Sequence, residues 1–216
     1  KAIFDSCHDA LGSPKPLEPL PPLGRCVQLN PGRASRSAYC RNPTDENCAV
    51  DMYWQIGTDD GSKVSGKLAL LEHIMYESLF DTLRTKQQLG YSVSCSARNT
   101  QGVLGFLISI TSHSHSVSDI EDRALTFVRT WLSTTLKTMP DAEYASNVQA
   151  AATNRLLADK TIEDEASRYW FELEQRAYCF GRAEAEAAAM RSTSKRELLK
   201  WAEECLLSKK ARRLVI

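Results

Sequence analysis

The chain has 216 residues and balances 27 Lys and Arg against 27 Asp and Glu, so its formal net charge is zero. No long block of one charge could follow a phosphate backbone or an anionic membrane, which argues against nucleic acid and membrane partners. No segment approaches the roughly 20 apolar residues of a membrane helix. The seven cysteines lack C-x-x-C spacing and are odd in number, which favours free thiols in a reducing, cytoplasmic compartment.

The first 24 residues differ in composition from the rest. Residues 1–11 have the pattern of a helix end, and the prolines of residues 12–22 disfavour regular structure because they fix φ and lack an N–H donor. We interpret residues 1–24 as the end of a preceding domain with a proline-rich linker. Residues 25–216 are expected to form one domain.

A strand followed by a long amphipathic helix is predicted next. Apolar side chains alternate from Cys48 to Gly57, the period of a half-buried strand, and the run from Asp59 to Ser62 ends it. From about Lys63, apolar residues recur every three or four positions, as on one face of a helix. This stripe consists of Val64, Leu68, Leu71, Met75 and Leu79.

A hairpin and a helical tail complete the predicted order of elements. Alternation indicates strands near Tyr91 to Arg98 and Leu104 to Ile110, with a turn at residues 99–102. Helical spacing follows over three stretches, at about residues 120–132, 141–157 and 162–177.

The last part of the chain predicts one more helix and a strand. Ser194 and Glu197 have the spacing of a capping box, which would start the helix. The apolar residues 214–216 resemble the start of a strand cut short. Together these elements predict an α+β fold, in which an antiparallel-rich sheet packs against one layer of α-helices.

The segment Phe80-Asp-Thr-Leu-Arg-Thr-Lys-Gln-Gln-Leu-Gly-Tyr91 joins the predicted long helix to the next strand through a polar pattern that composition does not explain. It resembles the signature F-x-x-L-R-T-x-x-Q-L-G-Y of the pitrilysin/insulysin family of zinc metalloproteases. Every fixed position is present, at Phe80, Leu83, Arg84, Thr85, Gln88, Leu89, Gly90 and Tyr91. The resemblance spans about residues 25–216 and implies the last of four related α+β repeat domains.

These proteases hold zinc with a motif H-x-x-E-H, which this chain lacks. Because the family domains look like internal duplications, the corresponding helix should read Ala69-Leu-Leu-Glu72-His73, where alanine replaces the first ligand. Glu72 and His73 are expected to form an ordinary polar helix edge, and the segment from His113 to His115 a solvated loop. The resemblance therefore places the zinc cofactor and the general base in the N-terminal half of the same protein.

Arg84 and Tyr91 are the candidate site residues, to which the resemblance gives the role of contacting substrate near the cleaved bond. A guanidinium can donate to peptide carbonyls, and a phenol can donate to the oxyanion of a tetrahedral intermediate. The alternative is structural, with Arg84 capping helix carbonyls and Tyr91 as an ordinary strand aromatic. Gly90 is expected to permit a close approach or an unusual backbone conformation. Three apolar positions are expected to fix the turn by packing: Phe80, Leu83 and Leu89.

The sequence therefore predicts a substrate-binding domain of a zinc metalloendopeptidase that cleaves peptides, inactive without the zinc-bearing half. The complete protein could also form a homodimer. Two alternatives stay open: a non-catalytic structural member of the family, or a module that binds a peptide along an exposed sheet edge. The intact Arg84 and Tyr91 pattern favours the enzyme, since a purely structural subunit has no evident use for it.

Overall fold

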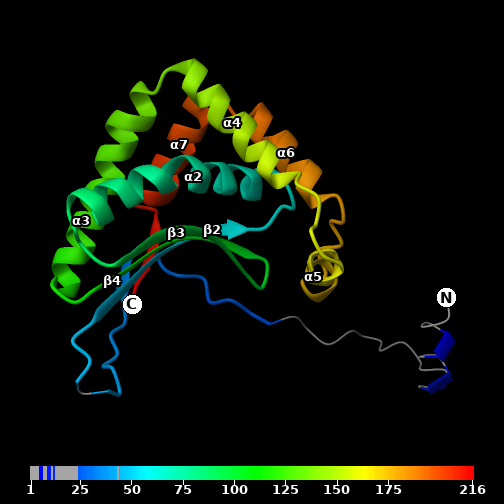
Figure 1. The fold of residues 1–216 in the computed structure, drawn as a ribbon, viewed down its shortest axis with the longest axis horizontal. Helices are drawn as coiled ribbons and strands as arrows, with labels where there is room; N and C mark the ends of the chain where they lie inside the picture. The colour runs from blue at the N-terminus through cyan, green and yellow to red at the C-terminus, as the bar shows by residue number, and fades with distance from the viewer. Residues whose placement is uncertain (1–4, 7–8, 11, 13–23, 43) are drawn as a thin grey trace.

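The computed structural model describes residues 5–6, 9–10, 12, 24–42 and 44–216. Most of the predicted helix end and most of the predicted linker lie outside these residues. One five-stranded sheet runs through the domain in the order β1-β5-β2-β4-β3, and the helices gather on one side of it (Figure 1). The strands are β1 Gly32–Ser35, β2 Cys48–Thr58, β3 Ser92–Thr100, β4 Val103–Ser112 and β5 Arg212–Val215.

The helices follow the predicted order, with one addition. They are α2 Lys63–Leu79, α3 Val117–Thr130, α4 Asp141–Arg155, α5 Ile162–Glu174, α6 Arg182–Ser192 and α7 Lys195–Leu206. Two π-helical segments extend α2 and α3, namely η1 Phe80–Lys86 and η2 Trp131–Leu136. Within the described residues, no helix is both long and apolar enough to span a bilayer.

The sheet is mixed but mainly antiparallel. β4 pairs antiparallel with β3 on one side and with β2 on the other, β5 pairs antiparallel with β2, and among the described strands only β1 and β5 pair in parallel. The predicted α+β architecture with an antiparallel-rich sheet and a helical layer is confirmed. The last apolar residues do form a strand, and this strand lies inside the sheet between β1 and β2.

The core lies between the sheet and the helical layer. The alternation in β2 places Val50, Met52 and Trp54 on the buried face, and the Trp54 indole donates to the Leu206 carbonyl at 3.0 Å. The predicted stripe of α2 is buried from Leu68 to Leu79, while its first member is only half-buried. The buried face of β2 and the buried stripe of α2 hold the signature in place. Both could be predicted from periodicity alone.

Two details of the helical tail differ from the prediction. Helix α6 was not predicted because its alanines and glutamates show no apolar period, yet it packs closely on α2, where a Cβ at Gly66 would lie 2.9 Å from the Ala189 Cβ. The capping box at Ser194 is half formed. The Ser194 hydroxyl accepts from the Glu197 N–H, but the Glu197 carboxylate pairs with Lys67 at 2.5 Å.

Candidate functional site

The signature begins where α2 widens into the π-helix η1. At its end the Gln87 N–H donates to the Thr82 carbonyl at 2.9 Å, a bond spanning five residues. Leu83 and Leu89 are fully buried, and the Leu89 N–H donates to the Leu83 carbonyl at 2.9 Å. The wide turn is therefore anchored in the core, and π-helical segments are frequent at functional sites.

Gly90 brings the chain against strand β4. A Cβ at this position would lie 2.3 Å from the Thr111 carbonyl oxygen, a distance that real Cβ atoms do not show. The next residue, Tyr91, donates its N–H to the same oxygen at 3.0 Å. The predicted close approach is confirmed, whereas the unusual backbone conformation belongs to Gln88, with φ of 50°.

Arg84 and Tyr91 come together across this turn. The Arg84 Nε donates to the Tyr91 backbone carbonyl at 3.2 Å, which leaves the phenol free of that contact. Tyr91 is 55% exposed and lies directly before β3. Arg84 thus binds the carbonyl of the residue before β3 rather than the helix carbonyls of the structural alternative. Among the described residues, the Arg84 guanidinium makes no other hydrogen bond or ion pair, so its terminal nitrogens can serve a ligand.

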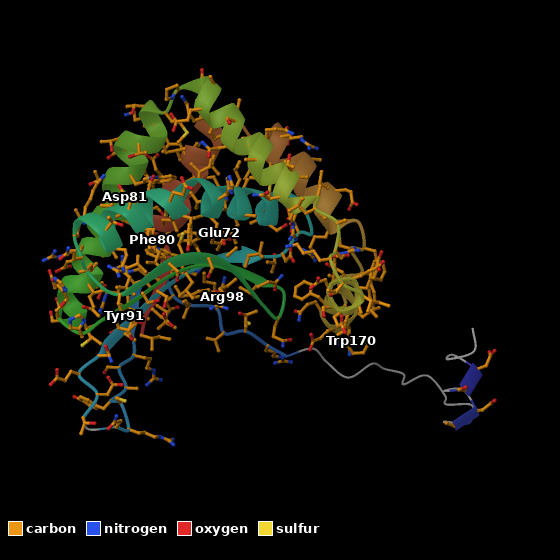
Figure 2. All side chains as sticks on the ribbon, in the orientation of Figure 1. Glu72, Phe80, Asp81, Tyr91, Arg98 and Trp170 are labelled. Atoms are coloured by element: carbon orange, nitrogen blue, oxygen red, sulfur yellow. The ribbon has the colours of Figure 1, made fainter. Side chains whose placement is uncertain are left out.

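Phe80 is not buried in the core, so its predicted packing role is wrong. It is 42% exposed and lies one turn before Arg84. Figure 2 shows Phe80 near one end of α2, with Glu72 farther along the helix. The i and i+4 spacing of Phe80 and Arg84 could have revealed a shared helix face. The signature therefore presents an aromatic ring, a guanidinium and a phenol outside the core.

The segment from Ala69 to His73, which the resemblance aligns with the zinc motif, lies on helix α2. Ala69, Glu72 and His73 line a cleft of about 660 Å³ between α2 and α4. The Glu72 carboxylate accepts from the Ala97 N–H at 2.9 Å. Burial raises the pKa of Glu72, while the bond from Ala97 opposes the shift. The carboxylate is thus held by a strand rather than left on a free helix edge.

Zinc does not fit this cleft. Ala69 offers no lone pair where the first ligand would stand, and a catalytic zinc needs three protein ligands. In the part of the chain that the structure describes, no group of three or more His, Cys, Asp or Glu side chains could hold a metal ion. His73 lines the cleft but belongs to no such group among the described residues.

Two further histidines directly follow β4, close in the chain to Thr111, whose carbonyl contacts the signature. The predicted loop at His113 and His115 follows β4, and His115 lies 3.8 Å from the Asp119 carboxylate, a neighbour that the pattern did not show. The cysteines within the described residues are free. Burial raises the pKa of Cys95 to about 12 and that of Cys205 to about 11, so neither thiol forms a nucleophilic thiolate at neutral pH.

Comparison with known proteins agrees with this geometry. A family model described as PQQ synthase PqqF-like, C-terminal lobe domain 4, matches residues 70–170. Human insulin-degrading enzyme is 32% identical over 184 residues, covering 84% of this chain and 18% of that protein. The crystal structure of pitrilysin has the same fold, with a TM-score of 0.81 at 19% identity over 99% of this chain and 22% of that chain.

A further structural neighbour is described as a peptidase M16 inactive domain from Pseudomonas fluorescens. Its TM-score is 0.55 at 11% identity, over 85% of this chain and 42% of that chain. The chain spans about a fifth of the length of the curated relatives that it matches. It belongs to the pitrilysin/insulysin family of metalloproteases, as a domain of the C-terminal lobe.

Proposed function

We propose that this domain binds peptide substrates at the exposed face formed by Phe80, Arg84 and Tyr91, and thereby completes the active site of a zinc metalloendopeptidase. The proposal rests on how the signature segment is held, with some residues buried and others outside the core. Buried Leu83 and Leu89 fix the π-helical turn, while exposed Phe80 and Tyr91 and half-buried Arg84 lie outside the core. Side chains of this kind on a fixed backbone suit substrate contact.

Each of the three side chains has a distinct use toward a peptide. The Arg84 Nε is engaged with the Tyr91 carbonyl, which orients the guanidinium while its terminal N–H groups remain for a substrate carbonyl. The Tyr91 phenol can donate to the oxyanion that develops at the cleaved bond. The Phe80 ring offers apolar area to a substrate side chain.

The zinc and the water-activating base are assigned to the N-terminal half of the same protein, since Ala69 leaves no ligand set in this one. We further propose that residues 25–216 form this C-terminal domain, that residues 1–24 connect it to a preceding domain, and that the domain alone has no peptidase activity. Peptide substrates and the zinc-bearing half are then its partners.

A non-catalytic family member is the second candidate. It is supported by the similarity to a domain described as inactive and by the alanine at position 69. Binding of a peptide along the edge of β3 is less favoured. The Ala97 N–H already donates to Glu72, and Val93 and Cys95 are buried.

The deciding experiment measures cleavage of a quenched fluorescent peptide by this chain alone, by the N-terminal half alone, and by the two mixed, with zinc present throughout. We expect turnover in the mixture and none with this chain alone. Circular dichroism and size-exclusion chromatography verify that both halves are folded and associated. A folded, associated and silent mixture would support the non-catalytic member instead.

A further inference from the structure

A small polar pocket lies at the edge of the sheet opposite to β3, away from the signature. Its volume is about 160 Å³, and it is enclosed by strands β1 and β5, helix α3 and the loop between α7 and β5. Three arginines line it, Arg33, Arg129 and Arg213, together with Ser208 of the loop. The proposed peptidase function uses none of these residues.

The fold brings the three arginines together from distant parts of the chain. Arg33 of β1 and Arg213 of β5 are register partners in the parallel pair, so their side chains stand side by side on one face. Arg213 is also the partner of buried Trp54, so this face is the one under the helices. Arg129 reaches the same pocket from α3.

One carboxylate, that of Glu121, contacts two of these arginines. Glu121 of α3 accepts from the Arg33 Nε and Nη2, each at 2.7 Å, and lies 3.5 Å from the Arg213 Nη2. Within the described residues, Arg129 has no carboxylate within salt-bridge distance. The lining of the pocket therefore carries an excess of positive charge.

The buried donors of this pocket are incompletely satisfied. The Arg213 Nε is buried and has no hydrogen-bond partner among the described residues. Burial lowers the pKa of Arg213, Glu121 opposes the shift, and Arg33 and Arg129 lower it further. A buried donor without an acceptor is costly, and a nearby anion would remove both the missing bond and the repulsion.

We propose that this pocket binds a phosphate group, held between Arg129 and Arg213, with the Arg33 and Glu121 pair as a fixed wall. Guanidinium forks match phosphate oxygens and bind them through pairs of N–H groups. A tetrahedral oxyanion can accept from several directions, as arginines on three elements require. The pocket has room for such an ion, because a single water needs only about 10–15 Å³ of the same kind of volume.

The test is isothermal titration calorimetry of the 216-residue chain with inorganic phosphate, against sodium chloride of equal ionic strength. We expect saturable phosphate binding that Arg129→Gln weakens roughly tenfold, since one charge-assisted contact is lost. Arg129 is exposed, so the variant should keep its fold, which circular dichroism verifies. Arg191→Gln is the matched control, an exposed helical arginine without an ion pair among the described residues, and should bind like the parent.

A second titration with ATP identifies the source of the group. Tighter binding of ATP than of phosphate, again lost in Arg129→Gln, would mean that the phosphate belongs to a nucleotide, and equal binding would mean free phosphate. The proposal is overturned if phosphate does not bind saturably. Equal weakening by Arg129→Gln and Arg191→Gln would overturn it as well, because binding would then follow general surface charge.

Discussion

Two parts of the helical segment from α2 to η1 differ in their candidate functional residues. The middle of α2 lines a cleft of about 660 Å³ and carries the segment that the resemblance aligns with the zinc motif, yet Ala69 cannot be a ligand. At the other end, the signature is complete and places Phe80, Arg84 and Tyr91 outside the core. Under the proposed function, this helix lacks the metal-binding end and keeps the substrate-contact end.

Under the proposed function, the position of a metal site and that of a substrate-contact site lie at two different places along one helix. The Glu72 carboxylate has become a structural partner of the Ala97 N–H on strand β3. The signature has instead kept side chains for which the fold has no evident need. If the comparison is right, stability and activity should respond to different residues along the same helix.

The sharpest contrast in stability is expected inside the signature itself. Leu83→Ala should destabilise the domain by about 3 kcal/mol, because it removes a fully buried side chain and leaves a cavity. Phe80→Ala should cost less than about 1 kcal/mol, since the ring is largely outside the core. Urea unfolding of both variants measures the difference. Similar losses of unfolding free energy in the two variants would mean that Phe80 packs in the core after all.

Gly90 offers the next contrast. Gly90→Ala should destabilise the domain by about 2 kcal/mol, because the new methyl group would lie 2.3 Å from the Thr111 carbonyl oxygen. Gly57→Ala is the matched control, since a Cβ there meets nothing within 4 Å. Thermal unfolding compares them, and equal melting temperatures would show that the turn does not depend on this close approach.

A smaller effect is expected at the other end, from Glu72→Gln. Burial raises the pKa of Glu72 in the folded state. The contribution of this carboxyl to the free energy of unfolding is therefore fully present below the ordinary carboxyl pKa. It is lost as pH rises through the folded-state pKa. The amide can still accept from the Ala97 N–H, so the variant should be slightly more stable than the parent at pH 7 and equal to it near pH 3. Unfolding at both pH values tests the sign; a variant less stable at pH 7 would contradict it.

The sequence predicted those features that depend on local periodicity. The alternation of β2 and the apolar stripe of α2 gave correct elements and the correct buried faces. The fixed residues of the signature predicted a helix-to-strand turn with a close approach at Gly90. These features could be found because each is encoded within about a dozen neighbouring residues.

What could not be predicted depends on contacts between distant residues. Arg182 pairs with Asp59 at 2.7 Å across 123 positions of the chain, which ties α6 to the end of β2. Strand β5 entered the sheet between β1 and β2, and neither the parallel pairing nor the meeting of Arg33 with Arg213 has a local signal. The exposure of Phe80 was not predicted for a similar reason. An aromatic residue near an apolar helix stripe is expected in the core unless the neighbouring layer is known.

The most direct test of the account compares two tyrosines on either side of the division, in the complete protein that contains this chain. Tyr91→Phe removes the phenol of the signature, and Tyr76→Phe removes a 44% exposed phenol that lines the α2 cleft. We predict that kcat for a peptide falls roughly a hundredfold in Tyr91→Phe, the cost of one transition-state donor, and stays at the parent value in Tyr76→Phe. An unchanged kcat in Tyr91→Phe would contradict the proposed role of the signature.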